Sequence, residues 1–409
     1  MEFQHTTLEN GLTVIGERNN DAKSVAIGYF VNTGSRDETL DVSGVSHFLE
    51  HMLFKGSEAI SALEINNEFD AMGAKYNAFT SEEVTAYHGA VMPEYQERLL
   101  RLLTTMMRPA LRSDDFDVEK NVILEEIEMY KDRPEFALFD ELRPQYFGTH
   151  PLGQSILGTS ESIRDLKRDQ MLEYFERRYA PNNITLGVSG NYDWDATLEQ
   201  VRAMTSTWLP AKTGREHPSL KPTPTVRMLE TQKFNRAHIA LMCPGFASTD
   251  PLRYAAGVLG VIVGDGENSR LYWALVDQGL ADSASLDHNA EGGLGHFDGY
   301  ISADPERAQE VLEVYRKVLQ DVQANGITQA ELDRAKRKVA VAMVMRAETP
   351  YSRLFALGME YLESQTYRSL QESVNLVQAI TLTDVQAVLE TKPFDALSIV
   401  GLGPISRLT

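Results

Sequence analysis

SGVSHFLEHMLFKG, residues 43–56, is the most informative stretch of the sequence. Its apolar residues recur at helical spacing, which predicts a helix that is buried along one side. Two histidines lie four residues apart, so their side chains share one face of this helix. Glu50 lies between them in the sequence. The stretch therefore predicts a buried helix that carries His47, Glu50 and His51, with Ser43 as its N-cap.

Two imidazoles on one helix face can hold one metal ion. Zinc suits this task because it accepts imidazole ligands and lowers the pKa of a bound water toward neutrality. A glutamate beside the ion can then take the proton of that water. Burying these polar side chains on an apolar helix without a partner would be costly, which also favours a metal. We expect one zinc ion per chain, with His47 and His51 as ligands and Glu50 as the base.

A catalytic zinc site needs a third protein ligand. The best source is DVEKNVILEEIEMYKD, residues 117–132, where Glu119 and Glu126 lie seven residues apart and share a helix face. Acidic runs on helices are also common as solvated faces. From spacing alone, Glu125, Glu126 and Glu128 all stay open as the third ligand.

The composition indicates a globular protein of 409 residues, 43% hydrophobic and 24% charged. The net charge of −20 argues against nucleic acid as a partner, because that binding needs basic patches. The sequence has no apolar run long enough for a membrane span and no signal peptide pattern at its start. The single cysteine, Cys243, excludes an intrachain disulfide, and we expect a cytoplasmic protein. The Gly-rich segment 264–269 lacks the lysine of a phosphate loop, so we expect no nucleotide binding.

Two segments of the chain share one plan. Each has a strand, then an apolar helix, and later a long charged helix that ends near a proline. Residues at offsets of 213 and 216 match between the segments, which indicates a duplication. We expect an α+β fold of two tandem homologous domains, each a mostly antiparallel sheet packed with helices. The expected domains are 1–212 and 229–409, joined by a Pro-, Lys- and Thr-rich linker at 213–228.

HFLEHMLFKGS resembles the inverted zinc-binding motif of the insulinase/pitrilysin family of metallopeptidases. NVILEEIEMYKD is similar to the family segment that supplies the third ligand. This resemblance implies that Glu126 is that ligand and that Glu119 is an assisting acidic residue. The resemblance covers nearly the whole chain, and its length is like that of bacterial members related to the mitochondrial processing peptidase. It implies a zinc-dependent endopeptidase in which two-domain units close like a clamshell around an unstructured peptide.

NAFTSEEVTAYH, residues 77–88, resembles the substrate-edge strand of the same family. The resemblance implies that Asn77, Ala78 and Phe79 pair with an extended peptide through main-chain hydrogen bonds, which recognise sequence loosely. An ordinary internal strand is the alternative. Glu83 is expected to orient a histidine ligand by accepting its ring N–H.

The second segment departs from the first at every site residue. The equivalent positions cannot bind a metal: Gly260, Val263, Gly264, Ala335 and Ala342. The second domain is therefore expected to form a chamber wall or a dimer surface.

Complete members of the family carry an Arg and a Tyr in the second domain, where they stabilise the oxyanion. Here the equivalent residues are Leu275 and Asp282, and neither can donate to an oxyanion. We expect a heterodimer in which a homologous subunit supplies the missing pair, with a homodimer as the alternative. A second hypothesis for the function is a non-catalytic assembly subunit of the same fold.

Overall fold

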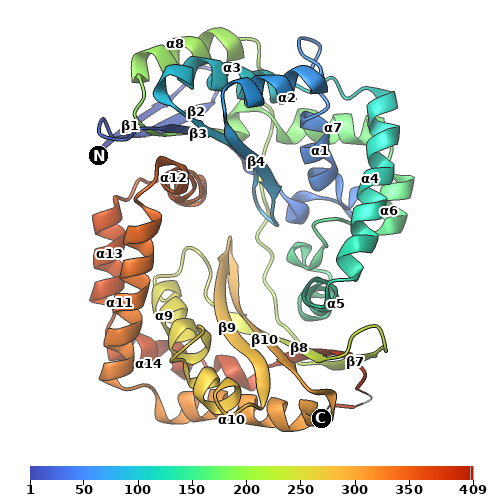
Figure 1. Cartoon of the computed structure of the whole chain (residues 1–409), viewed down its shortest axis with the longest axis vertical. Coiled ribbons are helices and arrows are strands. Elements are labelled where there is room, and N and C mark those ends of the chain that lie inside the picture. The colour runs from blue at the N-terminus through green and yellow to red at the C-terminus, as the bar shows by residue number, and fades with distance from the viewer. Residues whose placement is uncertain (406, 409) are drawn as a thin grey trace. The chain divides into compact units, whose positions relative to one another are not determined.

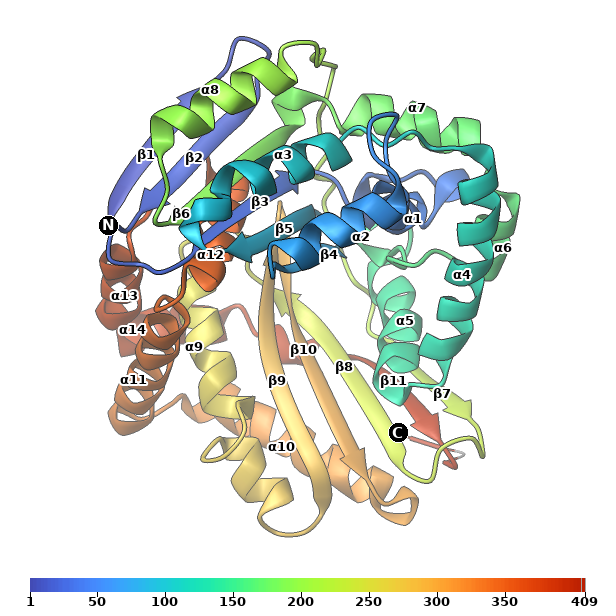
Figure 2. The same cartoon turned by 45° about the horizontal axis from the view of Figure 1, so that its top comes forward.

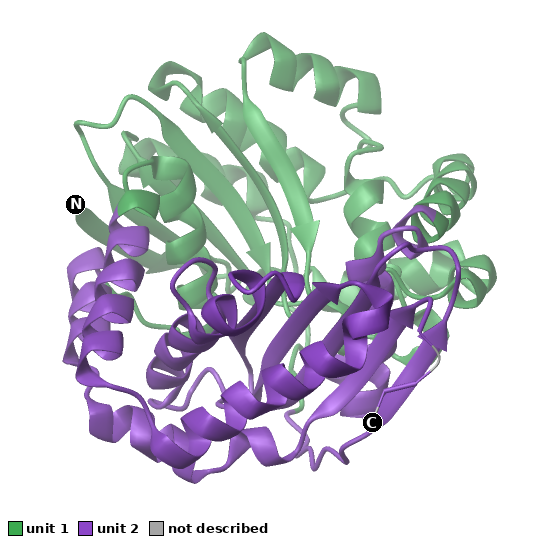
Figure 3. Cartoon of the chain, turned by 60° about the horizontal axis from the view of Figure 1, so that its bottom comes forward, with its two compact units in different colours: residues 1–128, 154–216, 345–368 green, residues 129–153, 217–344, 369–409 purple. Residues whose placement is uncertain are grey.

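The computed structural model describes residues 1–405 and 407–408 (Figures 1 and 2). The chain forms two compact units (Figure 3), each with one sheet and its own helices. The predicted α+β fold of two related domains is confirmed. The units are assembled from three chain segments each. Unit 1 comprises residues 1–128, 154–216 and 345–368, and unit 2 comprises residues 129–153, 217–344 and 369–409.

The sheet of unit 1 has six strands in the order β1-β2-β6-β3-β5-β4. Every neighbouring pair is antiparallel except β2 and β6, which are parallel. In that order the strands are Glu2–Thr7, Thr13–Arg18, Ile184–Gly190, Val25–Val31, Thr85–Val91 and Lys75–Thr80. The helices of this unit are α1 (Val45–Leu53), α2 (Ala62–Ala71), α3 (Gln96–Met106), most of α4 (Ser113–Lys131), α6 (Ser160–Asp165), α7 (Arg168–Arg178), α8 (Trp194–Thr205) and α12 (Pro350–Ser364).

Strand β3 is apolar at every position except one glycine, and all of its residues are buried. Both faces of the unit 1 sheet are therefore covered. Val25, Ile27 and Tyr29 belong to the main core with the helices of the N-terminal segment. Phe30 faces the other way, against α12. The approach of α12 is close, since a Cβ at Gly358 would lie 2.2 Å from the Phe30 ring.

The sheet of unit 2 repeats this plan with five strands in the order β7-β11-β8-β10-β9. Its one parallel pair, β7 and β11, takes the place of β2 and β6. In sheet order the strands are Val226–Glu230, Ser398–Gly403, Ala237–Gly245, Leu294–Ala303 and Ala281–Glu291. The helices are α5 (Pro134–Phe147), α9 (Arg253–Gly264), α10 (Ala308–Asn325), most of α11 (Gln329–Arg346), α13 (Leu370–Ala379) and α14 (Leu382–Glu390).

Each unit takes one helix from the other half of the sequence. Helix α5 follows α4 in the first half but packs on β8 and β11 of unit 2 (Figure 2), through Leu138 and Leu142. Helix α12 follows α11 in the second half but packs on β3 and β6 of unit 1. The expected division of the sequence into 1–212, 213–228 and 229–409 remains a prediction, because it concerns segments and these units are discontinuous.

The duplication inferred from the sequence appears at element level. Helices α4 and α5 begin at Ser113 and Pro134, and α11 and α12 begin at Gln329 and Pro350, the same offset of 216 in both cases. The strand, apolar helix and long charged helix of the shared plan are β3, α1 and α4 in the first segment and β8, α9 and α11 in the second. Within the described residues, none of the helices is both long and apolar enough to cross a membrane.

Candidate metal centre

Helix α1 is held at its N-terminus by a buried carboxylate. Glu38 accepts hydrogen bonds from the backbone N–H groups of Gly44 and Ser46, at 2.6 and 2.7 Å. Gly44, not the predicted Ser43, is the N-cap, and it provides no side-chain cap. Only glycine fits there, because its φ is +91° and a Cβ would lie 2.6 Å from the Leu157 carbonyl oxygen.

The predicted apolar stripe of α1 is buried, which fixes the direction of its polar face. The buried side chains are Val45, Phe48, Leu49, Met52 and Leu53. The polar side chains of the same helix therefore point toward α4 and β4. The His47 and His51 rings lie 4.7 Å apart, centroid to centroid.

Glu126 on α4 completes a three-residue cluster with these histidines. Its Oε2 lies 3.8 Å from His47 Nε2 and 3.5 Å from His51 Nε2. One ligand atom from each of the three residues lies within 4.8 Å of the others. Tetrahedral zinc with bonds of about 2.0–2.1 Å would hold its ligand atoms about 3.3–3.4 Å apart. The donor set and its spacing therefore fit zinc after a small contraction.

Glu119 contacts the far side of the His51 ring. Its Oε1 lies 2.9 Å from His51 Nδ1, so the imidazole sits between two carboxylates of α4. Lys55 forms an ion pair with the other oxygen of Glu119. This arrangement leaves His51 Nε2 for a metal, because a histidine ligand commonly donates its second N–H to a carboxylate.

The electrostatics of the cluster favour a cation. Burial, and then the neighbouring His51, lower the pKa of His47 to about 3, so this imidazole is neutral as a ligand must be. Burial would lower the pKa of His51, but the carboxylates of Glu119, Glu126 and Glu50 outweigh it and raise that pKa. Burial raises the pKa of Glu126 and of Glu50. Three carboxylates around two imidazoles therefore form a site that a divalent ion would stabilise.

Glu50 is near the cluster but is held separately from the three ligand candidates. It lies one turn after His47, and Thr80 Oγ1 donates a hydrogen bond to its Oε2 at 2.6 Å. Thr80 is the last residue of β4, which brings the edge of the sheet to the carboxylate. The sequence did not identify Thr80, because its contact spans thirty residues and follows no periodic pattern. Lys55 could have been found, because it lies only four residues after His51, just beyond the end of α1 at Leu53.

The predicted substrate residues lie on an edge strand. Strand β4 pairs with β5 and ends the sheet, so its other edge has no partner strand within the described residues. Asn77 is exposed, Ala78 is nearly buried and Phe79 packs partly against α12. The alternative of an internal strand is therefore excluded, while the binding role stays a prediction.

Glu83 does not contact a histidine of the cluster. Its carboxylate pairs with Arg36 and Arg215, and Arg215 also donates to its backbone carbonyl. The structure brings Glu119, rather than Glu83, to the imidazole of His51. Glu83 instead connects the β4–β5 turn to Arg215, which lies between α8 and β7 in the sequence.

Leu275 and Asp282, the positions where the family resemblance predicts an Arg and a Tyr, have structural roles in unit 2. Leu275 is fully buried. Asp282 forms an ion pair with Arg236. Arg270, which also lies in this region, binds Glu331 and Asp321. Leu275 is therefore packed in the core, and Asp282 and Arg270 are held in ion pairs, so none of the three is assigned to stabilise a substrate oxyanion.

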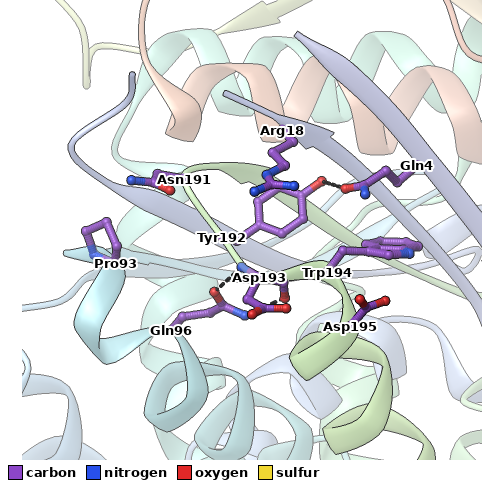
Figure 4. Close-up of a pocket in the computed structure, with 9 residues that line it drawn as sticks. All are labelled: Gln4, Arg18, Pro93, Gln96, Asn191, Tyr192, Asp193, Trp194 and Asp195. Carbon is purple, nitrogen blue, oxygen red and sulfur yellow. Dashed lines mark hydrogen bonds between the residues drawn. The ribbon is translucent and has the colours of Figure 1, made fainter. Parts of the chain in front are cut away.

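A polar cavity of about 540 Å³ also lies in unit 1 (Figure 4), and it shares no residue with the metal cluster. Its polar side chains bind one another: Tyr192 donates to Gln4, and Gln96 bonds the backbone of Asp193. These hydrogen bonds therefore connect β1, α3 and α8. It is lined by Gln4, Arg18, Pro93, Gln96, Asn191, Tyr192, Asp193, Trp194 and Asp195.

Known family profiles match most of the chain. Residues 13–160 match the profile described as insulinase, peptidase family M16, and residues 165–339 match that of the peptidase M16 inactive domain. An uncharacterized zinc protease of Bacillus subtilis is 32% identical over 93% of this chain and 93% of its own.

The chain belongs to the insulinase family of peptidases. Another relative, an uncharacterized zinc protease of Streptomyces coelicolor, is 32% identical over 97% of this chain and 89% of its own. The fold is shared with a protease from Helicobacter pylori, at a TM-score of 0.92 and 21% identity over 98% of this chain and 99% of that one. Membership of the insulinase family supports a hydrolase of the protease class, and its relatives are named for zinc.

Proposed function

We propose that this chain is the metal-bearing subunit of a zinc metalloendopeptidase that hydrolyses unstructured peptides. The observation that carries the proposal is the convergence of His47, His51 and Glu126 at ligand spacing. Glu50 lies beside this cluster, and a free sheet edge lies beside Glu50. A metal site, a base and a peptide-binding edge are three of the parts that such a reaction needs.

His47, His51 and Glu126 would hold the ion. When bound, zinc polarises the substrate carbonyl and lowers the pKa of a coordinated water toward neutrality. Glu50 would accept the proton of that water and return it to the leaving amine. Glu119 keeps the His51 ring oriented through Nδ1, and Lys55 balances the charge of Glu119.

Substrate binding is proposed at the free edge of β4. An extended peptide can add to this edge through main-chain hydrogen bonds with Asn77, Ala78 and Phe79. The same strand ends at Thr80, beside Glu50, so a peptide aligned along β4 would run past the base. An unstructured peptide can become extended along this edge without first unfolding, which is why unstructured peptides are the proposed substrate class. The clamshell chamber implied by the family resemblance remains a prediction.

Oxyanion stabilisation requires a partner. Leu275 is buried and Asp282 is ion-paired, so this chain provides no donor at those positions. A second copy of the chain would bring the same two residues. We therefore propose a heterodimer with a homologous subunit that carries Arg and Tyr there, in preference to a homodimer.

Two observations favour a second candidate, a non-catalytic assembly subunit. The absence of the Arg and Tyr pair is compatible with loss of catalysis, and the second half matches a profile described as inactive. The fold is also shared with a chain of complex III from Candida albicans, at a TM-score of 0.83 and 19% identity. The intact cluster around Glu50 favours the peptidase.

The test is to measure cleavage of a fluorogenic unstructured peptide by the zinc-loaded chain, alone and mixed with a homologue that carries the Arg and Tyr. Activity should appear on mixing and should be lost when the partner's Arg is replaced by Ala. Full activity of the chain alone would contradict the heterodimer. A metal-loaded chain that stays inactive with every partner would favour the assembly subunit.

A further inference from the structure

The contact between Thr80 and Glu50 joins two parts of the site that lie far apart in the sequence. Thr80 ends β4, the strand proposed to bind substrate, and its hydroxyl donates to Glu50 Oε2 at 2.6 Å. Side chains alternate along a strand, so Tyr76, Ala78 and Thr80 share one face. On that face Tyr76 stacks on Phe69 of α2, with ring centroids 3.7 Å apart, which holds β4 against α2.

Glu50 depends on this hydrogen bond for its orientation. A glutamate side chain has several rotatable bonds, and its terminal carboxylate torsion is broad, so burial alone does not fix the direction of its oxygens. Within the described residues, Thr80 is the hydrogen-bond donor to the Glu50 carboxylate. The bond engages Oε2, and no hydrogen bond to Oε1 is seen within the described residues. A hydrogen bond to a charged group is also stronger than one between neutral groups.

We infer that Thr80 is a positioning residue that orients Glu50 for proton transfer and ties that orientation to the substrate-binding strand. The inference rests on the proposed function, since it concerns the base of that reaction. A purely structural reading is that the hydroxyl only satisfies a buried carboxylate. The two readings differ in what a variant should change: a positioning role affects the rate, while a structural role affects folding and metal content.

Thr80→Val is the decisive variant, because it removes the hydroxyl and keeps the β-branched shape that suits a strand. In the partnered, zinc-loaded complex we expect kcat to fall about 10- to 100-fold, the value of one hydrogen bond to a charged group. KM, zinc content and the unfolding temperature should stay at wild-type values. Thr80→Ser, which restores a hydroxyl, should return kcat to within about threefold of wild type.

A double-mutant cycle with Glu50→Gln tests whether Thr80 acts through Glu50. If it does, Thr80→Val should cause no further loss of residual turnover in the Glu50→Gln background. The exposed strand residue Thr7 provides a matched control, since Thr7→Val removes a hydroxyl of β1, away from the cluster. Additive losses in the cycle would overturn the inference. A kcat of Thr80→Val equal to wild type, or a loss that Thr80→Ser does not restore, would also overturn it.

A readout without turnover separates this inference from the proposed function. Visible absorption of bound Co²⁺ depends on coordination geometry and on the groups around the ion. The Co²⁺ spectrum should differ from wild type in Thr80→Val, because Glu50 is released, and should match wild type in Thr80→Ser and Thr7→Val. Identical spectra in all four proteins would contradict the positioning role. If the spectra differ as expected but the wild-type complex cleaves no peptide, the peptidase proposal would be contradicted and the positioning role would not.

Discussion

Helices α1 and α9 occupy the same place in two copies of one fold, yet they meet their sheets differently. Helix α9 lies directly against the edge strand β9 (Figure 2), where a Cβ at Gly264 would come within 2.0 Å of the Leu286 backbone nitrogen. Helix α1 instead presents His47, Glu50 and His51 from the equivalent helix. In this fold the space between the helix and the edge strand can therefore hold either closely packed backbone or chemically reactive side chains.

The second long helix shows the same contrast. Helix α4 of the first half provides Glu119 and Glu126 to the cluster. At the equivalent offset, α11 has Ala335, which is buried in the core of unit 2, and Ala342. Bringing buried charged groups together costs folding free energy in unit 1, and a bound metal would offset this cost. Unit 2 has no charged groups at the equivalent positions.

Replacing the base tests the chemical side of the comparison. Glu50→Gln should lower turnover of the partnered complex by about 10²- to 10⁴-fold, because the amide cannot accept a proton. Zinc content, measured by atomic absorption, should not change, because Glu50 is outside the three-ligand cluster. Exposed Glu58 gives the matched control, Glu58→Gln. More than a tenth of wild-type turnover in Glu50→Gln would contradict the assignment of the base.

Helices α12 and α5 each form an ion pair with a strand of the sheet they cover. The helix provides the cation in one pair and the anion in the other, and the two pairs differ in burial. Arg353 of α12 binds Glu17 of β2, with side-chain exposures of 8% and 1%, while Glu141 of α5 binds Arg227 of β7 at the surface. Arg353→Met should lower the free energy of unfolding by about 3–5 kcal/mol, because Glu17 would stay buried without its partner. Arg227→Met should cost no more than about 1 kcal/mol. Urea denaturation measures both, and equal losses would show that burial does not distinguish the pairs.

Adding one methyl group to α9 tests the closed side of the comparison. Gly264→Ala should destabilise the protein by about 1–3 kcal/mol, because the new Cβ would overlap the backbone of β9. Gly257→Ala on the same helix is the control, since nothing lies within 4 Å of a Cβ there and alanine favours a helix. Thermal unfolding followed by circular dichroism compares them. Equal stability of the two variants would mean that α9 does not pack on β9 as described.

Removing the carboxylate behind His51 should have the smallest effect. Glu119→Gln should weaken zinc binding about 10- to 100-fold, because the ring loses a charged acceptor at Nδ1 but keeps Nε2 for the metal. Glu125→Gln, at an exposed position of the same helix, should bind zinc like wild type. Competition with a chromophoric chelator gives both affinities. A stronger effect of Glu125→Gln would transfer the assisting role to Glu125.

Periodicity accounts for the part of the site that the sequence could predict. The spacing of His47 and His51 placed both rings on one face, and the spacing of Glu119 and Glu126 placed both carboxylates on another. Spacing could not choose between Glu125, Glu126 and Glu128, and the family resemblance made that choice. In the structure it is Glu126 that meets the histidines.

Contacts between distant segments could not be predicted in this way. The cap of α1 comes from Glu38 instead of Ser43, and the donor to Glu50 comes from Thr80. The pairing of Glu83 with Arg215 likewise joins residues that no local pattern connects. The exchange of α5 and α12 was missed because an apolar helix face shows that it is buried but not which sheet buries it.

Anomalous X-ray scattering from crystals of the zinc-loaded protein, recorded on both sides of the zinc absorption edge, tests the metal centre most directly. We expect one zinc peak per chain, about 2.0–2.2 Å from His47 Nε2, His51 Nε2 and a carboxylate oxygen of Glu126. A crystal of Glu126→Gln soaked in the same way should show a weakened peak or none. A full peak elsewhere, or a wild-type peak with Glu126 turned away from it, would contradict the assignment.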